Sequence, residues 1–259
     1  MTKILIPIET ASGERRVSAT PSAVKKLKSL GCEVFVESSA GELSGFNDTL
    51  YKESGGEIVS KSNINIWENA DVVFCVQTPS ESNLGKLKKG AILLGLLNPY
   101  ANEKLQKTIT SKKISALSME LLPRISRAQS SDVLSSQANI AGYKAVLLAA
   151  SELDRYFPML MTAAGTVQPA KVVVLGGGVA GLQAVATAKR LGAIVFVSDI
   201  RPAVKEQVES LGARFIELPE IDEKPGESGG YAKAVTPEFL SKQKATLTKY
   251  LSEADVAVC

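Results

Sequence analysis

The stretch from Lys171 to Arg201 constrains the fold of this chain more than any other segment. It starts with an apolar strand at Val172–Leu175 and passes through three consecutive glycines into a helix predicted at Ala180–Leu191. A second apolar strand, Ile194–Val197, then ends at Asp199. Strand, glycine turn, helix and strand in this order are typical of the unit that binds the pyrophosphate of a dinucleotide.

Each glycine of the turn has a predicted role. Gly176 makes the tight turn, Gly178 leaves room for a pyrophosphate close to the backbone, and Gly181 lets the helix pack closely on the strand. Val179 and Ala180 open the helix, where free N–H groups and the positive end of the helix dipole favour an anion. We therefore predict that these five residues bind a nucleotide.

The acidic end of the second strand completes the predicted site. Asp199 follows Gly176 by 199 − 176 = 23 positions, near the distance of about 20 at which an acid binds the adenosine ribose. Its charge repels a 2′-phosphate and favours NAD(H) over NADP(H), whereas a nearby arginine such as Arg201 can accommodate that phosphate. We assign Asp199, Ile200 and Arg201 to the cofactor site. The alternative is a purely structural glycine turn, and the complete context favours nucleotide binding.

Composition excludes several other classes of function. The net charge is only +3, and short lysine runs without interleaved aromatic residues favour solvated helix faces over a nucleic-acid site. No run of about 20 apolar residues predicts a membrane span. The three cysteines, which show no pairing pattern, favour a reduced, cytoplasmic setting. Histidine is absent, which removes the commonest acid–base group and metal ligand, and we predict no metal site.

The pattern of apolar segments predicts an α/β fold made of two doubly wound, Rossmann-like domains with parallel sheets, linked by a long helix. We place an N-terminal α/β domain at 1–140 and a nucleotide-binding domain at 141–259. Strands are predicted in the first half at Lys3–Pro7, Glu33–Glu37, Asp71–Val76, Ala91–Leu94 and Ile114–Ala116. Helices are predicted there at Ser22–Leu30, introduced by Thr20 and Pro21, and at Ala101–Thr110, with the linking helix at 135–156.

The second half continues with a helix at Ala203–Leu211, a strand at Arg214–Glu217, a helix at Pro237–Ser252 and a strand at Val256–Cys259. In a doubly wound sheet the fourth strand lies beside the first and expects a further neighbour, so we expect this domain to be truncated after its fourth strand. The segment Leu218–Pro237 is too long for an ordinary connection. It is either a flexible insertion or a flap that closes over the nucleotide, with Tyr231 as its anchor.

Three segments together carry a resemblance to a known family. These are Glu14–Pro21, Pro123–Gln137 with its continuation to Tyr143, and the glycine unit. Together they resemble the NAD(H)-binding component of proton-translocating nicotinamide nucleotide transhydrogenase, within a superfamily that includes alanine dehydrogenase. The resemblance covers the chain from Met1 to Cys259, and its most specific part is Arg124–Gln137.

The resemblance implies roles for residues that spacing alone would assign to a helix-cap network. The family residues that match Arg124, Gln129, Asp132 and Ser135 contact the nicotinamide half of NAD(H), and Gln129 also faces NADP(H) held by a partner polypeptide. Tyr231 matches a tyrosine of a mobile loop. The resemblance further implies an NADP-binding partner domain, a membrane-spanning proton channel, a homodimer, and a peripheral position on the cytoplasmic face of the membrane.

Two rival functions are kept. The first is an amino-acid dehydrogenase, since alanine dehydrogenases resemble this chain. They place a lysine at Gln77 and a histidine near Asn98, and amino-acid oxidation needs such an acid–base group. Arg15 matches their substrate-carboxylate arginine, although we expect it to pair with Glu14 or a neighbouring acid. The second rival is a non-catalytic NAD(H)-binding module.

Overall fold

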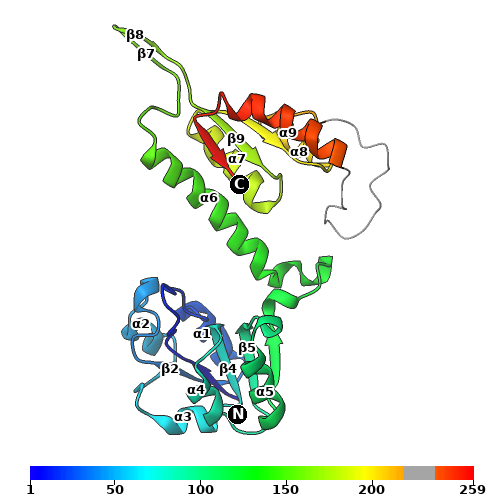
Figure 1. Ribbon diagram of the computed structural model, residues 1–259. Helices are drawn as coiled ribbons and strands as arrows, with labels where there is room; N and C mark the ends of the chain where they lie inside the picture. Colours follow the sequence, from blue (N-terminus) through cyan, green and yellow to red (C-terminus); the bar gives the residue numbers. More distant parts are fainter. Residues whose placement is uncertain (219–236) are drawn as a thin grey trace. The chain divides into compact units, whose positions relative to one another are not determined.

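The computed structural model describes residues 1–218 and 237–259, and it divides into two compact units, Met1–Asp132 and Val133–Cys259 (Figure 1). The long helix α6 (Val133–Glu152) opens the second unit. The domain boundary expected at residue 140 therefore falls inside α6. Each unit is built around its own parallel sheet.

The first unit contains a six-stranded parallel sheet in the order β3-β2-β1-β4-β5-β6. Its strands are β1 (Lys3–Ile6), β2 (Glu33–Glu37), β3 (Glu57–Val59), β4 (Val72–Gln77), β5 (Ile92–Leu96) and β6 (Ser115–Ser118). The order reverses between β1 and β4, which is the topological switch point of a doubly wound sheet. This confirms the predicted architecture of the first half.

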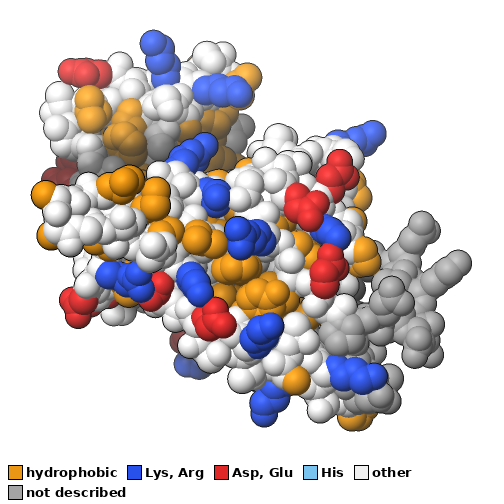
Figure 2. Space-filling model, turned by 90° about the horizontal axis from the view of Figure 1, so that it is seen from above, with side chains coloured by type: hydrophobic (Ala, Val, Ile, Leu, Met, Phe, Trp, Pro, Cys, Tyr) orange, Lys and Arg blue, Asp and Glu red, His pale blue; other side chains and the backbone are white. Residues whose placement is uncertain are grey.

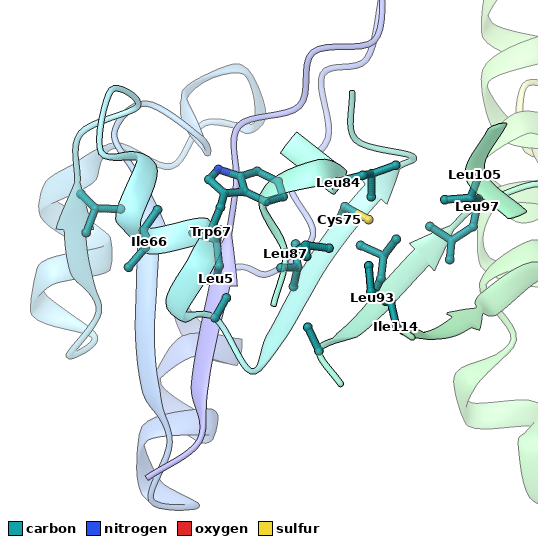
Figure 3. Close-up of a cluster of buried hydrophobic side chains, with 14 residues drawn as sticks. Leu5, Ile66, Trp67, Cys75, Leu84, Leu87, Leu93, Leu97, Leu105 and Ile114 are labelled. Carbon is teal, nitrogen blue, oxygen red and sulfur yellow. The ribbon is translucent and has the colours of Figure 1, made fainter. Parts of the chain in front are cut away.

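Helices cover both faces of this sheet. They are α1 (Pro21–Ser29), α2 (Asp48–Glu53), α3 (Ile64–Asn69), α4 (Glu81–Lys86) and α5 (Glu103–Lys112). Because successive strand residues point to opposite faces, Ile6 joins a core with Val24 of α1 and Tyr51 of α2. Leu5 joins a second core, which contains Trp67 and buried leucines of α4, β5 and α5 (Figure 3).

The start of α1 shows how local sequence fixes an element. The side chain of Thr20 accepts a hydrogen bond from the N–H of Ala23, and Pro21 occupies the first turn. Both features were predicted, because a capping hydroxyl satisfies a free N–H and proline has none to lose. The hydroxyl of Tyr51 donates to the carbonyl of Ala19, which ties α2 to the loop before α1.

The second unit holds a four-stranded parallel sheet in the order β11-β10-β9-β12. Its elements after α6 are β9 (Lys171–Leu175), α7 (Val179–Arg190), β10 (Ile194–Ser198), α8 (Val204–Ser210), β11 (Arg214–Phe215), α9 (Pro237–Leu251) and β12 (Val256–Val258). The fourth strand, β12, pairs with the first, β9, as predicted. The switch point of this sheet therefore lies at the carboxyl end of β9.

Both faces of the second sheet are covered as well. Val172 and Val174 of β9 pack in one core with α6, α7 and α8. On the opposite face, the ring of Phe196 in β10 lies 5.3 Å from that of Tyr250 in α9. An antiparallel hairpin, β7 (Leu160–Thr162) and β8 (Gly165–Val167), extends from this unit (Figure 1).

Short elements escaped the sequence reasoning. Strand β3 has three residues and helices α2, α3 and α4 have six residues each, so none is long enough to show a clear periodicity. The hairpin was also missed. Longer elements were located to within a few residues.

The surface carries charges of both signs. On the face shown in Figure 2, lysine and arginine side chains are interspersed with acidic and apolar ones. Among the helices of residues 1–218 and 237–259, none combines the length and the apolar character needed to cross a bilayer.

Candidate functional site

The glycine turn sits at the switch point of the second sheet. Only three residues, Gly176–Gly178, connect the end of β9 to the start of α7. Gly176 has φ +101°, a conformation that favours glycine, and its N–H donates to the carbonyl of Ser198 at 2.8 Å. The first turn of α7 is therefore held directly above the end of the central strand.

The start of α7 is open. Gly178 is the N-cap, and no side chain of the described residues caps the helix there. A methyl group placed on Gly178 would meet no heavy atom within 4 Å beyond its chain neighbours. Because the first N–H groups of a helix have no acceptor within it, Val179, which is exposed, and Ala180 present donors beside open space. This arrangement suits an anion.

Two other glycines allow backbones to approach closely. A Cβ on Gly181 would lie 1.8 Å from the carbonyl oxygen of Gly176, which explains why α7 lies so close to the turn. A Cβ on Gly142 of α6 would lie 2.0 Å from the carbonyl oxygen of Ala180. Asn139 of α6 also donates to the side-chain oxygen of Gln183 in α7, at 3.1 Å. Helix α6 thus supports the turn from behind.

Asp199 lies just past the end of β10 and is held by four donors. Its Oδ1 accepts from the backbone N–H and Nε of Arg201 at 2.8 and 2.9 Å. Its Oδ2 accepts from the N–H of Gly177 at 2.7 Å and from Nη2 of Arg201 at 2.9 Å. The Asp199 side chain is 6% exposed and that of Arg201 is 41% exposed. The carboxylate is thus fixed beside the glycine turn.

The surroundings of Asp199 keep it ionised. Burial by itself raises the pKa of this carboxyl, but the hydrogen bonds from Arg201 and Gly177 and the charge of Arg201 outweigh burial. Its pKa therefore lies below the usual range for aspartate. An ionised carboxylate is the form that accepts hydrogen bonds from ribose hydroxyls.

Sequence reasoning missed Gly177 and Gly142. Gly177 is buried, and a Cβ there would lie 2.2 Å from Cγ1 of Val204 in α8. It both orients Asp199 and lets α8 approach the turn. The signal was an unbroken run of three glycines, because a spaced fingerprint leaves the middle one unexplained. Ile200, assigned to the site, is partly buried between Asp199 and Arg201.

The four residues predicted to contact the nicotinamide lie in consecutive segments. Gln129 belongs to a 3-10 helix, η4 (Ser126–Ser131), Asp132 ends that helix, and Ser135 lies in the first turn of α6. Arg124 and Gln129 are exposed, whereas Asp132 and Ser135 are partly buried. Arg124, Asp132 and Ser135 each have an interaction partner. Tyr231 and the predicted flap lie outside the described residues apart from their ends.

The switch point of the first unit also gathers charged groups. The carboxylate of Glu9 accepts from the N–H groups of Val76 and Gln77 at 2.6 and 3.0 Å. Burial raises the pKa of Glu9, although these two hydrogen bonds oppose the shift. Glu9 therefore closes the end of β4 with a protein side chain.

Glu14 lies in the same cluster and pairs with Arg16. It accepts from the backbone N–H, Nε and Nη2 of Arg16, and from Nε2 of Gln77 at 3.0 Å. The hydrogen bonds from Arg16 and Gln77 outweigh burial and lower the pKa of Glu14 to about 2. Our expectation that Arg15 pairs with Glu14 or a neighbouring acid is wrong. Within the described residues, the exposed Arg15 side chain has no ion pair, because Arg16 occupies Glu14.

Neither switch point holds a group of metal ligands. Over residues 1–218 and 237–259, His, Cys, Asp and Glu side chains nowhere form a cluster of three or more suited to a metal ion. The candidate site is therefore the glycine turn with Asp199.

Comparison with known proteins matches almost the whole length of the chain. Residues 5–141 match the family described as "Alanine dehydrogenase/PNT, N-terminal domain", and residues 145–259 match its C-terminal domain. A curated relative from Rhodospirillum rubrum, named as an NAD(P) transhydrogenase subunit alpha protein, is 49% identical over 99% of this chain and 68% of its own length.

Two further relatives extend the comparison. The "NAD(P) transhydrogenase subunit alpha" of Haemophilus influenzae is 43% identical over 98% of this chain, and the chain spans about half (49%) of that protein. A solved structure of transhydrogenase from Sinorhizobium meliloti has a TM-score of 0.86 and 44% identity, covering 98% of this chain and 68% of that one.

Proposed function

The chain belongs to the alanine dehydrogenase/PNT family, and from this premise we propose that it is the NAD(H)-binding component of an NAD(P) transhydrogenase. A hydride passes directly between NADH on this chain and NADP⁺ on a partner polypeptide or domain. A membrane-spanning component couples the transfer to proton movement. The chain acts as a homodimer on the cytoplasmic face of the membrane.

The observation that carries this proposal is the open glycine turn beside Asp199. Gly178 faces free space at the start of α7, and Asp199 stands ionised beside it. A pyrophosphate fits at the helix start, because N–H donors and the helix dipole both favour an anion. The adenosine ribose then reaches Asp199, as in other dinucleotide-binding units.

The nicotinamide half is assigned to the segment before α6. Arg124, Gln129, Asp132 and Ser135 hold and orient the ring, and Gln129 also faces NADP(H) on the partner. Family likeness supports these roles. Tyr231 approaches the bound nucleotide from the segment outside the described residues.

Hydride transfer between two nicotinamides asks little of acid–base chemistry. The reduced ring loses H⁻, the oxidised ring gains it, and no proton moves at the reacting carbon. The chain must bind, align the ring and exclude water. A sequence without histidine meets these demands.

The amino-acid dehydrogenase rival demands more. Oxidation of an amino acid removes a proton as well as a hydride, so an acid–base group must face the substrate. In this chain Gln77 cannot serve as one, and its amide donates to Glu14. Steady NAD⁺ reduction that depends on L-alanine would support the rival and contradict the proposal.

Calorimetry tests the nucleotide assignment. We expect NADH to bind the purified chain at least about tenfold more tightly than NADPH, a difference of about 1.4 kcal/mol. Equal affinities would contradict the role given to Asp199. The chain alone should show no transfer between NADH and NADP⁺.

Isotope transfer tests the reaction itself. The chain is mixed with a purified NADP-binding component, NADP⁺ and NADH deuterated at the transferred position of C4, in ordinary water. Direct transfer places the deuterium on NADPH without loss to solvent. NADH binding without any transfer would support the third reading, a non-catalytic module.

A further inference from the structure

The carboxylate of Asp199 has no acceptor position to spare. Each oxygen accepts two hydrogen bonds: Oδ1 from the N–H and Nε of Arg201, and Oδ2 from Gly177 and from Nη2 of Arg201. A carboxylate offers about four such positions in total. A ribose hydroxyl can therefore donate to Asp199 only if one of these donors withdraws.

The four donors differ in how easily they withdraw. The N–H of Gly177 belongs to the turn that α7 and Val204 hold in place, and the N–H of Arg201 belongs to the backbone. The guanidinium of Arg201 is 41% exposed and rests on a flexible side chain. Given the proposed function, on which this inference rests, the ribose hydroxyls replace the guanidinium and leave the two backbone donors in position.

The displaced guanidinium then stands beside the ribose, where an NADP(H) molecule would carry its 2′-phosphate. Arginine is suited to such a group, because its planar fork binds phosphate oxygens in pairs. The neighbouring cation of α8, Lys205, is paired with Glu217. Arg201 can thus serve a phosphate only when Asp199 releases it without repelling the phosphate.

We propose that Arg201 is a specificity-determining residue, a latent 2′-phosphate ligand that Asp199 holds in an ion pair. Asp199 then excludes NADP(H) in two ways: its charge repels the 2′-phosphate, and its hydrogen bonds occupy the arginine that would otherwise bind it. The alternative is that Arg201 only orients Asp199. The two differ in what happens to Arg201 once the carboxylate is removed.

The experiment compares four proteins as full chains: the unaltered protein, Asp199→Asn, Arg201→Gln and the double variant. Dissociation constants are measured by calorimetry for NADH, NADPH, ADP and adenosine 2′,5′-bisphosphate. The last two compounds isolate the adenosine half from any contact with the nicotinamide. Each measurement is repeated at low and high salt, since screening weakens a guanidinium–phosphate contact.

We expect Asp199→Asn to bind NADPH at least about tenfold more tightly than the unaltered protein, and NADH about tenfold more weakly. The NADPH gain should disappear in the double variant and should shrink at high salt. Arg201→Gln alone should show no NADPH gain, because the Asp199 charge remains. Adenosine 2′,5′-bisphosphate should follow NADPH in all four proteins.

A matched control is available in the first unit. Glu14 and Arg16 form the same pair through the same atoms, with side chains 8% and 38% exposed. Glu14→Gln should leave NADPH affinity unchanged within about twofold, because no glycine turn lies beside it. A gain there would show that the Asp199→Asn effect is merely one of net charge, and would overturn the proposal.

Equal NADPH affinities in Asp199→Asn and the double variant would also overturn it. Failure of the unaltered protein to bind NADH is a different result, which would reject the proposed function itself. If Asp199→Asn does not fold by circular dichroism, Asp199→Ser replaces it, since its hydroxyl can still accept from Gly177. The same comparison with and without Arg201 then decides the outcome.

Discussion

Glu14 in the first unit and Asp199 in the second are held by nearly identical clamps. Each acid pairs with the arginine two positions later, one oxygen accepting from the arginine N–H and Nε and the other from Nη2. The fourth donor differs: Gln77 supplies a side-chain amide to Glu14, whereas Gly177 supplies a backbone N–H to Asp199.

The surroundings of the two clamps differ much more. In the second unit, α7 begins three residues after β9, and its start is open. In the first unit, residues 7–20 separate β1 from α1, and Thr20 caps that helix. Both clamps lie at the switch point of a parallel sheet, where ligands bind in such folds. A saturated acid–arginine pair is therefore not a binding site by itself, and the open backbone beside it makes the difference.

The largest effect that would test this comparison comes from Gly181→Ala. Its Cβ would lie 1.8 Å from the carbonyl oxygen of Gly176, so the turn must move and the second unit loses about 3 kcal/mol of stability. NADH binding should be lost with it. Circular dichroism during thermal unfolding measures the loss, and an unchanged melting temperature would contradict the close packing of α7 on the turn.

Gly178→Ala should separate binding from folding. Its Cβ points into open space at an ordinary φ of −77°, so the free energy of unfolding should stay within about 0.5 kcal/mol. The methyl group fills the space assigned to the pyrophosphate, and NADH should bind about 100-fold more weakly, or about 2.7 kcal/mol. Undiminished NADH affinity in calorimetry would place the nucleotide elsewhere.

Glu37→Gln tests whether buried acids of the first unit are structural. Glu37 is 3% exposed and accepts from the N–H of Ile8 and from Nε1 of Trp67. A glutamine presents an NH₂ group to one of these donors, which costs about 2 kcal/mol. Trp67 is the single tryptophan, so its fluorescence reports unfolding of this unit. NADH affinity should stay within about twofold, and Glu57→Gln, at an exposed position, is the control.

Glu14→Gln should give the smallest effect, about 1 kcal/mol at neutral pH, because the partly exposed Arg16 is screened by water. The pKa of Glu14 is lowered from 4.5 to about 2, so its contribution is full above pH 4.5 and is lost as the pH falls toward 2. The difference between variant and unaltered protein in Trp67 fluorescence unfolding should vanish over that range. A difference that persists at pH 2 would refute the ion pair.

Much of the fold was predictable because its signals are local. The apolar strands, the capped helix at Pro21 and the order of strands in the second sheet follow from patterns a few residues long and from the rules of doubly wound sheets. The glycine turn was predictable for the same reason. The short elements β3, α2, α3 and α4 were not, since their formation depends on burial against the sheet.

The partners of the charged groups were less accessible. The sequence placed Asp199 beside the glycine turn but gave no sign that Arg201 occupies the carboxylate so fully. It led us to pair Arg15 with Glu14, whereas Arg16 makes that contact. Adjacent arginines look alike in a sequence, and backbone direction decides which one reaches the acid.

The sequence by itself determined where the chain forms a glycine turn, which helix starts there and which strand ends at an acid. These depend on φ preferences and on donors within a few residues of each other. Only the tertiary structure decided that Gln77 reaches Glu14 across 63 positions and that Gly142 touches Ala180. Such contacts depend on which strand ends and helices meet, and the packing of a whole unit fixes that meeting.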